Sequence, residues 1–333
     1  MKVILNGRLI DARQARLPVF DHSFLYGDGI YETVRAYDYR VFHWPEHFRR
    51  LRRSARRIEL KCPWSSRTLL QRVAQLLRAN NTPNASVRIT VSRGPGPLGL
   101  DPSVCPKPTL VMLTHPERDL NTLWKSGVSI GIPRIRRNHP RCLDPQIKSN
   151  NSLNTILARM EAKRMGVFEA VLLNLDSHLT EGTTSNIFFV KGRTIQTPAL
   201  SCGLLEGVTR GLVIKLARNA GFSVREGRYA LKDLRTADEI FLTSTTLEIM
   251  PVVLVKETPS GTPLSPTWDH RSDASLDRWP SFEREQRLLG RAVTCGDRGE
   301  GAHYRTYKPT SGHPGPITKS LHALFRASIH TPH

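Results

Sequence analysis

Residues 179–190 read LTEGTTSNIFFV, and this stretch decides how the rest of the chain is interpreted. A polar turn carrying Glu181 stands directly before an apolar segment that is typical of a buried strand. Lys148 lies 33 residues earlier in QIKSN (146–150), between an expected strand and an expected helix. Most lysines are solvated and many glutamates are turn residues, so neither is informative alone. Together they suggest an amine and a carboxylate that act at one site.

Two further segments could bind an anion. LEGVTR (205–210) begins an expected helix from about Gly207 to Gly221, and the free backbone N–H groups at such a helix start can hold a phosphate. LTSTTLEI (242–249) offers a second group of hydroxyls and amides. Either segment could also be an ordinary helix cap or turn. Their order along the chain, after Lys148 and Glu181, favours a common site.

The first 116 residues predict one α+β domain. An Asn-Gly pair at 6–7 between apolar pieces predicts a β-hairpin. Apolar spacing of three and four residues predicts helices over 45–60 and 65–79. Alternating and β-branched stretches predict strands over 29–39, 85–91 and 109–114.

Residues 117–127 are expected to link this domain to a second one over 128–333. Helices are predicted over 152–164 and 207–221, with strands over 128–132, 169–175, 186–191, 239–243 and 251–256. Residues 257–311 are rich in Ser, Pro, Gly and charge, which predicts a disordered insertion with a short helix near 281–292. A loop and a helix are expected after Gly312.

Composition narrows the functional class. No apolar run approaches the ~18–20 residues of a membrane helix, and the start does not resemble a signal peptide, so a soluble cytoplasmic protein is expected. The five cysteines form no CxxC pair, and the histidines lack metal-ligand spacing. Neither a disulfide framework nor a metal site is therefore indicated.

The net charge of +20 leaves three interpretations open: nucleic-acid binding, attraction of small anions, or a basic, arginine-rich proteome. Six arginines lie in the helix expected over 45–60, but aromatic residues for base stacking are not interleaved with them. A solvated helix face is the more common outcome, and nucleic acid is the less favoured partner. GPGPLG (94–99) fits a dinucleotide fingerprint, but its prolines prevent the helix that must follow.

In their order, these segments resemble the class IV, fold-type IV pyridoxal-phosphate enzymes. The family includes branched-chain aminotransferases, D-amino acid aminotransferases and aminodeoxychorismate lyases. The resembling segments cover nearly everything outside 257–311: FLYGDGIYETVRAY (24–37), EHFRRL (46–51), IKSNNSLNTILARMEA (147–162), LTEGTTSNIFFV (179–190), LEGVTR (205–210), DEIFLTSTTLEIMPV (238–252) and GPITKSLHALF (315–325). The resemblance implies a two-domain fold of the D-amino acid aminotransferase type, mixing α+β and α/β character, and a homodimer that completes a site between the domains.

The resemblance also implies a role for each matching residue. Lys148 takes the place of the lysine that binds the aldehyde of pyridoxal 5'-phosphate, and Glu181 that of the carboxylate facing the pyridine nitrogen. Arg50 matches the family's phosphate arginine. The other phosphate contacts fall to Val208 and Thr209 at the helix start and to Ser244 and Thr245 in the second turn.

The substrate residues give a mixed pattern. Tyr26 and Arg88 match the branched-chain branch, and Tyr31 and Thr246 are the other substrate contacts that the resemblance implies. Leu98, followed by Leu100, stands where the D-amino acid and lyase branches place an arginine, whereas Thr33 is closer to the lyase branch. The first expectation is transamination between a branched-chain L-amino acid and 2-oxoglutarate. The alternatives are aminodeoxychorismate lyase, D-amino acid aminotransferase, and a basic nucleic-acid-binding or inactive homologue.

Overall fold

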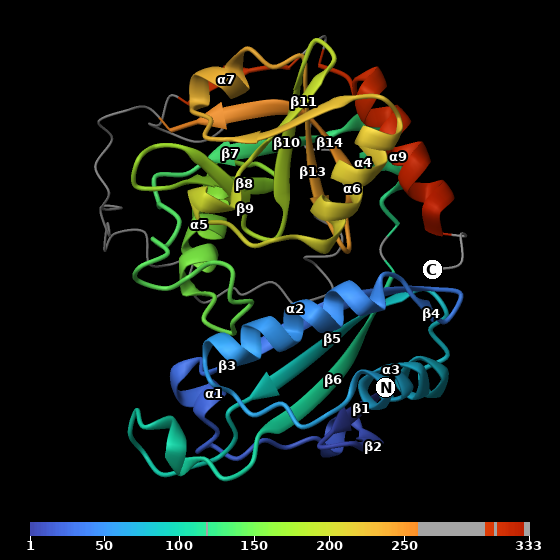
Figure 1. The fold of residues 1–333 in the computed structure, drawn as a ribbon, viewed down its shortest axis with the longest axis vertical. Coiled ribbons are helices and arrows are strands. Elements are labelled where there is room, and N and C mark those ends of the chain that lie inside the picture. The colour runs from blue at the N-terminus through green and yellow to red at the C-terminus, as the bar shows by residue number, and fades with distance from the viewer. Residues whose placement is uncertain (118, 259–303, 310–311, 330–333) are drawn as a thin grey trace, which may run out of the picture.

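The computed structural model describes residues 1–117, 119–258, 304–309 and 312–329. Two β-sheets divide the chain into two lobes, a first lobe up to Pro116 and a second lobe from Val128 onward (Figure 1). The expectation of a disordered insertion with a helix near 281–292 falls mostly outside the described residues.

The first lobe is a six-stranded sheet in the order β2-β1-β6-β5-β3-β4. Alternate residues of β3 point to opposite faces, as in any strand. Ile30, Val34 and Ala36 pack with helices α2 and α3 in one apolar core, which leaves the opposite face of the strand toward the second lobe. The elements are β1 (Lys2–Leu5), β2 (Arg8–Asp11), η1 (Ala12–Gln14), α1 (His22–Tyr26), β3 (Gly29–Tyr37), β4 (Arg40–Val41), α2 (Trp44–Arg57), α3 (Ser66–Ala79), β5 (Ala85–Ser92), η2 (Pro102–Val104) and β6 (Thr109–Pro116).

The second lobe is built on a nine-stranded sheet in which β9 pairs with both β8 and β10. These pairings close a ring in the order β10-β13-β14-β7-β8-β9, with β11 and β12 extending from β10. Helices α6 and α9 share an apolar core with β10 and β13. The elements are α4 (Asn121–Ser126), β7 (Val128–Ile132), α5 (Leu153–Arg164), β8 (Glu169–Leu173), β9 (Leu179–Gly182), β10 (Asn186–Lys191), β11 (Thr194–Pro198), η3 (Leu200–Cys202), α6 (Val208–Asn219), β12 (Ser223–Gly227), α7 (Leu231–Arg235), β13 (Glu239–Ser244), β14 (Glu248–Glu257), β15 (Arg305–Tyr307) and α9 (Pro316–Ile329).

The sequence-based elements need three corrections. The expected linker contains helix α4, whose Trp124 donates from Nε1 to the carbonyl of Leu247 at 3.1 Å. The stretch 257–311, expected to be disordered, is ordered at its edges: Glu257 ends β14, and β15 pairs antiparallel with that strand. The strands β9, β11 and β12 were not predicted at all.

Among the described residues, no helix is long and apolar enough to cross a membrane. The same residues hold no group of three or more metal-ligating side chains.

Candidate active site

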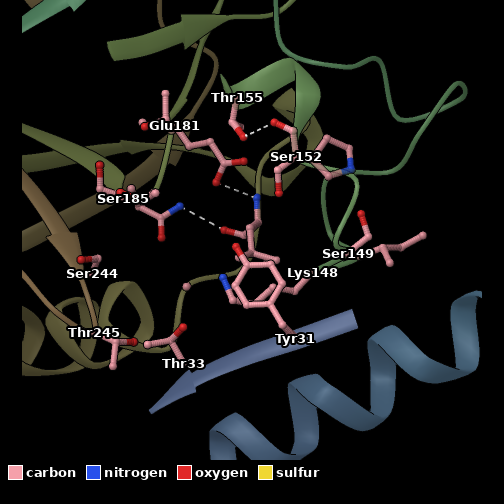
Figure 2. A pocket seen from close by; sticks show the side chains of 18 of the residues that line it. Tyr31, Thr33, Lys148, Ser149, Ser152, Thr155, Glu181, Ser185, Ser244 and Thr245 are labelled. Atoms are coloured by element: carbon pink, nitrogen blue, oxygen red, sulfur yellow. Dashed lines mark hydrogen bonds between the residues drawn. The ribbon is translucent and has the colours of Figure 1, made fainter. Parts of the chain in front are cut away.

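A cavity of about 300 Å³ lies between the two lobes and collects most of the predicted site residues. Figure 2 shows Tyr31 and Thr33 approaching from the first lobe and Glu181, Ser244 and Thr245 from the second. Of the residues that sequence reasoning singled out, those lining the cavity are Lys148, Glu181, Arg50, Val208, Thr209, Ser244, Thr245, Thr246, Tyr31, Thr33 and Arg88.

The backbone around Lys148 joins the second lobe to the first. The Lys148 N–H donates to Ser54 Oγ on α2 at 3.1 Å, and its carbonyl accepts from the Tyr31 N–H at 2.9 Å. The lysine Nζ lies 4.4 Å from the centre of the Tyr31 ring. The positive charge of Lys148, against the opposing effect of burial, lowers the pKa of Tyr31. The amine is thus held at a fixed place on the cavity wall, over an aromatic ring.

Glu181 lies in β9, and both of its carboxylate oxygens accept hydrogen bonds. Oε1 accepts from Arg137 Nε at 2.9 Å, and Oε2 accepts from the Leu205 backbone N–H at 3.0 Å. The Glu181 side chain is 8% exposed and that of Arg137 12%. Because a buried carboxylate is costly unless it is paired and hydrogen-bonded, these two donors stabilise an ionised Glu181 at the cavity wall.

The start of α6 faces the cavity without a side-chain cap. Gly207 is the N-cap residue and makes no side-chain hydrogen bond to the helix. A Cβ on Gly207 would lie 2.0 Å from Asn186 Oδ1, so a larger residue there would have to displace the buried Asn186 side chain. Val208 and Thr209 follow on the cavity wall. The uncapped amides and the helix dipole make this end of the cavity suited to an anion.

The turn between β13 and β14 supplies hydroxyls to the same end of the cavity. Ser244, Thr245 and Thr246 line it, and Ser244 Oγ also accepts from the Leu247 N–H at 3.1 Å. Thr243 Oγ1 is buried, borders the cavity and has no hydrogen-bond partner among the described residues. A buried hydroxyl without a partner is uncommon in folded proteins, and it adds to the polar character of this end of the cavity.

Arg50 reaches the cavity from α2 while forming a two-point ion pair. Its Nε and Nη2 donate to the two oxygens of Glu32 at 2.7 and 2.8 Å, and Nη1 donates to the Glu206 carbonyl at 3.0 Å. Burial alone would raise the pKa of Glu32, but Arg50 and His47 outweigh burial and hold it well below its usual range. The cation is therefore fixed beside the start of α6.

The neighbouring arginines of α2 lie at or near the surface, as expected, and two of them are also paired. Arg53 pairs with Glu206 at 2.5 Å and Arg57 with Asp144 at 2.5 Å. Both acids belong to the second lobe. Part of the positive charge of α2 therefore bridges the two lobes, which leaves less of it for a nucleic acid.

Two predicted substrate residues lie outside this chain's cavity. Tyr26 is 37% exposed and Leu98 70% exposed, and neither lines the cavity. The Tyr26 hydroxyl accepts from the Gly99 N–H at 3.0 Å, so the two loops are held together. Leu100, at 82% exposed, lies beside them. The two leucines therefore form no apolar wall in the cavity of a single chain.

Arg137 and Asn186 are two of the cavity residues that sequence reasoning missed. Arg137 is one of three arginines in RIRRN (134–138), and no local pattern distinguishes the one that meets Glu181. Asn186 ends the polar turn after Glu181 and donates from Nδ2 to the Leu205 carbonyl at 3.0 Å. Its position just before an apolar strand was a signal that could have singled it out.

Comparison with known proteins adds a family to this geometry. The family described as Amino-transferase class IV matches residues 29–255. A protein from Methanocaldococcus jannaschii that is provisionally named a branched-chain-amino-acid aminotransferase is 43% identical over 76% of this chain and 87% of its own length. An aminodeoxychorismate lyase from Bacillus subtilis is 35% identical over 78% of this chain and 88% of its own length.

A D-alanine aminotransferase from Listeria innocua is 35% identical over 76% of this chain and 86% of its own length. Among solved structures, a branched-chain amino acid aminotransferase from Escherichia coli superposes with a TM-score of 0.79 at 25% identity, over 98% of this chain and 93% of the other. The expected two-domain, mixed α/β fold of fold-type IV is confirmed by this likeness.

Proposed function

This chain belongs to the class IV aminotransferases, and we propose that it transfers the amino group of a branched-chain L-amino acid to 2-oxoglutarate. The family's cofactor is pyridoxal 5'-phosphate. The observation that carries the proposal is that Lys148, Glu181 and an anion-binding end meet in one cavity. These are the three features that an aldehyde, a pyridine nitrogen and a phosphate require.

The residues present fit this cofactor. Lys148 would hold its aldehyde carbon, and the ionised Glu181 would pair with a protonated pyridine nitrogen. Its phosphate would be held by Arg50, the amides of Val208 and Thr209, and the hydroxyls of Ser244 and Thr245. The unpartnered Thr243 Oγ1 and the uncapped start of α6 support a polar occupant at that end.

Each protein group then has a defined task. When bound, the cofactor supplies an electron sink that lets the substrate α-carbon lose its proton. Lys148 Nζ would take that proton and return it, as a general base and then a general acid. Glu181 would keep a positive charge on the ring nitrogen, and Arg137 would hold Glu181 ionised and oriented. The polar first-lobe wall would orient the substrate.

The choice of substrate is supported by Arg88 and by the named relative. The Arg88 guanidinium lies 3.7 Å from the centre of the Tyr31 ring, on the cavity wall. A planar cation there suits the second carboxylate of glutamate or 2-oxoglutarate. The relative at 43% identity carries a branched-chain aminotransferase name.

We also propose that the active unit is a homodimer. The helix α5 leaves Leu153, Ile156, Leu157 and Met160 between 41% and 63% exposed on its surface. A second copy covering this face would bury an apolar patch that is otherwise in water. In such a dimer, the exposed loops that carry Tyr26 and Leu98 would reach the cavity of the partner subunit and supply the apolar wall missing from one chain.

The second candidate is an aminodeoxychorismate lyase. Thr33, the residue closer to the lyase branch, lines the cavity, and the Bacillus subtilis lyase is 35% identical. A D-amino acid aminotransferase is the third, because of the Listeria innocua relative.

The test has two parts. Borohydride reduction of the cofactor-saturated protein, followed by peptide mapping, should place the adduct on Lys148; an adduct on another lysine, or none, would end the proposal. Leucine, alanine and D-alanine, each with 2-oxoglutarate as acceptor, are then compared with aminodeoxychorismate, whose cleavage needs no acceptor. Leucine should exceed alanine by roughly 10- to 200-fold in kcat/KM. Turnover of aminodeoxychorismate without leucine would favour the lyase, and preference for D-alanine the third candidate.

A further inference from the structure

A cluster of polar side chains lies behind the cavity wall and plays no part in the assignments above. The Glu248 carboxylate accepts from Tyr37 Oη at 3.0 Å, from His322 Nε2 at 3.0 Å and from Arg326 Nε at 2.6 Å. Its side chain is only 2% exposed. The donors come from β3 of the first lobe and from α9 of the second, and none of the four residues borders the cavity.

The backbone of Glu248 is unusual for a glutamate. Its φ is +56°, in the left-handed region that favours glycine. It closes the β13–β14 hairpin by pairing with Ser244, a position that hairpins of this kind commonly give to glycine. A side chain in this conformation costs free energy and persists only where the surroundings hold it in place. The three hydrogen bonds to the carboxylate provide that hold.

The hairpin turn that Glu248 closes is the one that presents Ser244, Thr245 and Thr246 to the cavity. Leu247, which lies between Thr246 and Glu248, is hydrogen-bonded through both its N–H and its carbonyl. Its N–H donates to Ser244 Oγ at 3.1 Å, and its carbonyl accepts from Trp124 Nε1 at 3.1 Å. The turn is therefore fixed along its length, from the cavity hydroxyls to the linker helix.

The aromatic ring of Trp124 connects the hydrogen bonds of Leu247 to the polar cluster around Glu248. The Arg326 guanidinium lies 4.4 Å from the ring centre, and the His322 ring lies 4.9 Å away. Burial, reinforced by the Glu248 charge, raises the pKa of Tyr37 well above its usual range, so its hydroxyl remains a donor. The first lobe and α9 thus meet at one carboxylate behind the turn, and the linker helix packs against the two α9 residues that bind it.

We propose that Glu248 is a positioning residue that fixes the Ser244–Thr246 turn against the first lobe and thereby sets the affinity for the phosphate end of the cofactor. This inference rests on the proposed function, which assigns that turn to the phosphate. The carboxylate acts on the phosphate only through the shape of the turn. Its loss should therefore weaken the phosphate contacts and leave those of Lys148 and Glu181 intact.

The experiment compares two probes on the apo-protein: pyridoxal 5'-phosphate, and pyridoxal, which lacks the phosphate. Glu248→Gln keeps the side-chain shape but loses the charge that accepts three hydrogen bonds. Glu248→Gly removes the carboxylate and gives the backbone the residue that it favours. Each should raise the Kd for pyridoxal 5'-phosphate about tenfold and change the Kd for pyridoxal less than about twofold.

A matched control is available on the same strand. Glu257 ends β14, is 4% exposed in its side chain and pairs with Arg235, away from the cavity. Glu257→Gln removes a buried, paired carboxylate of the same kind and should change neither Kd. Circular dichroism and thermal midpoints establish that each variant is folded. If Glu248→Gln does not fold, Tyr37→Phe removes a single donor instead. It should raise the Kd for pyridoxal 5'-phosphate by a smaller factor and leave the Kd for pyridoxal nearly unchanged.

The outcomes separate the two proposals. If wild type does not bind pyridoxal 5'-phosphate, the proposed function fails. If wild type binds it and the Glu248 variants bind it equally well, only the present inference is overturned. Equal weakening of both probes would likewise overturn it, since Glu248 would then support the fold in general. Wild-type affinity in Glu248→Gly alone would show that the backbone conformation, and not the carboxylate, sets the turn.

Discussion

The Arg137 guanidinium donates from Nε to Glu181 Oε1 at 2.9 Å, and this ion pair closes one wall of the cavity. Arg137 Nη1 also donates to Asn154 Oδ1 on α5 at 3.2 Å, which fixes the guanidinium from a second direction. Glu181 is thereby oriented by a residue that precedes Lys148 in the chain. The two groups proposed to act on the cofactor are thus held from one connected segment between β7 and α5.

Glu181→Gln should keep the cofactor bound and slow turnover. A neutral amide cannot stabilise a positive ring nitrogen, and that charge matters more in the transition state than in binding. The loss of one such contact is worth about 2–4 kcal/mol, or roughly 30- to 1000-fold in kcat. Absorbance of the bound cofactor and steady-state rates would measure both. Wild-type turnover in this variant would reduce Glu181 to a turn residue.

Arg137→Met should lower kcat while KM for the amino donor changes little. The substitution leaves the buried Glu181 with the Leu205 amide as its remaining partner, so the carboxylate is less firmly oriented. We expect kcat to decrease about tenfold, since residues that orient a functional side chain typically contribute on that scale. Arg134→Met is the matched control, because Arg134 lies in the same segment and pairs with Glu161 at 3.6 Å, away from the cavity. Equal rates in the two variants would contradict the role given to Arg137.

Local pattern predicted most of the helices. The helix expected over 45–60 is α2, Trp44–Arg57, and the one expected over 152–164 is α5, Leu153–Arg164. Periodic apolar spacing and end signals act over a few residues, so they can be read without knowing the fold. The polar turn before IFFV was recognisable for the same reason.

Other features depend on contacts between distant segments. Strand β15 pairs with β14 across about fifty residues, and no local signal carries that pairing. The cavity position of Arg137 depends on which of the three arginines in 134–138 faces β9. The resemblance assigned Tyr26 and Leu98 to the substrate site, but both side chains are exposed and neither lines the cavity of this chain. Topology, rather than pattern, decides each of these cases.

The free energy of unfolding should decrease at acid pH because of His47 and Glu32. Burial lowers the pKa of His47 below 6.5, and Arg50 and His47 hold that of Glu32 below 4.5 against the effect of burial. Each group binds protons more weakly in the folded chain than in the unfolded one. Its contribution is therefore complete above the unfolded pKa and is lost as the pH falls, first from about 6.5 and then from about 4.5.

Urea unfolding of wild type and His47→Gln, at a series of pH values from about 8 to 4, measures this effect. The variant should lose less stability than wild type between about pH 6.5 and 5, because it lacks the histidine that protonates on unfolding. Glu32→Gln should be less stable than wild type above about pH 4.5, where the Glu32 contribution is complete, and the difference should shrink as the pH falls below that value. Parallel pH curves for wild type and His47→Gln would show that His47 does not titrate on unfolding.

Ile156→Glu on α5 should convert a dimer into monomers. Ile156 is 51% exposed in the single chain and lies in the apolar face assigned to the second copy, where a buried unpaired charge is strongly unfavourable. Light scattering after size exclusion reports the mass, and kcat/KM for leucine should fall with it, since Tyr26 and Leu98 would no longer reach a partner cavity. Leu175→Glu is the control, because Leu175 is 65% exposed outside α5. A dimer that persists in Ile156→Glu would place the interface elsewhere.

Arg88→Met should impair glutamate and 2-oxoglutarate more than leucine. The guanidinium is stacked on Tyr31 and tied by Nη2 to Asn150 Oδ1 at 3.1 Å and by Nε to Thr90 Oγ1 at 3.3 Å. It is therefore held flat on the cavity wall, where a charge-assisted bond to a second carboxylate is worth about 1.5–3 kcal/mol. Methionine keeps the apolar contact with the ring and removes only the charge. We expect KM for 2-oxoglutarate to rise roughly 10- to 100-fold and kcat/KM for leucine, measured as a half-reaction, to change less than about threefold.

Arg88→Lys separates charge from shape: lysine keeps the charge but not the planar stack, and should recover part of the lost affinity for 2-oxoglutarate. An equal loss of kcat/KM for leucine and glutamate in Arg88→Met would mean that Arg88 supports Tyr31 and Lys148 in general and does not bind the second carboxylate.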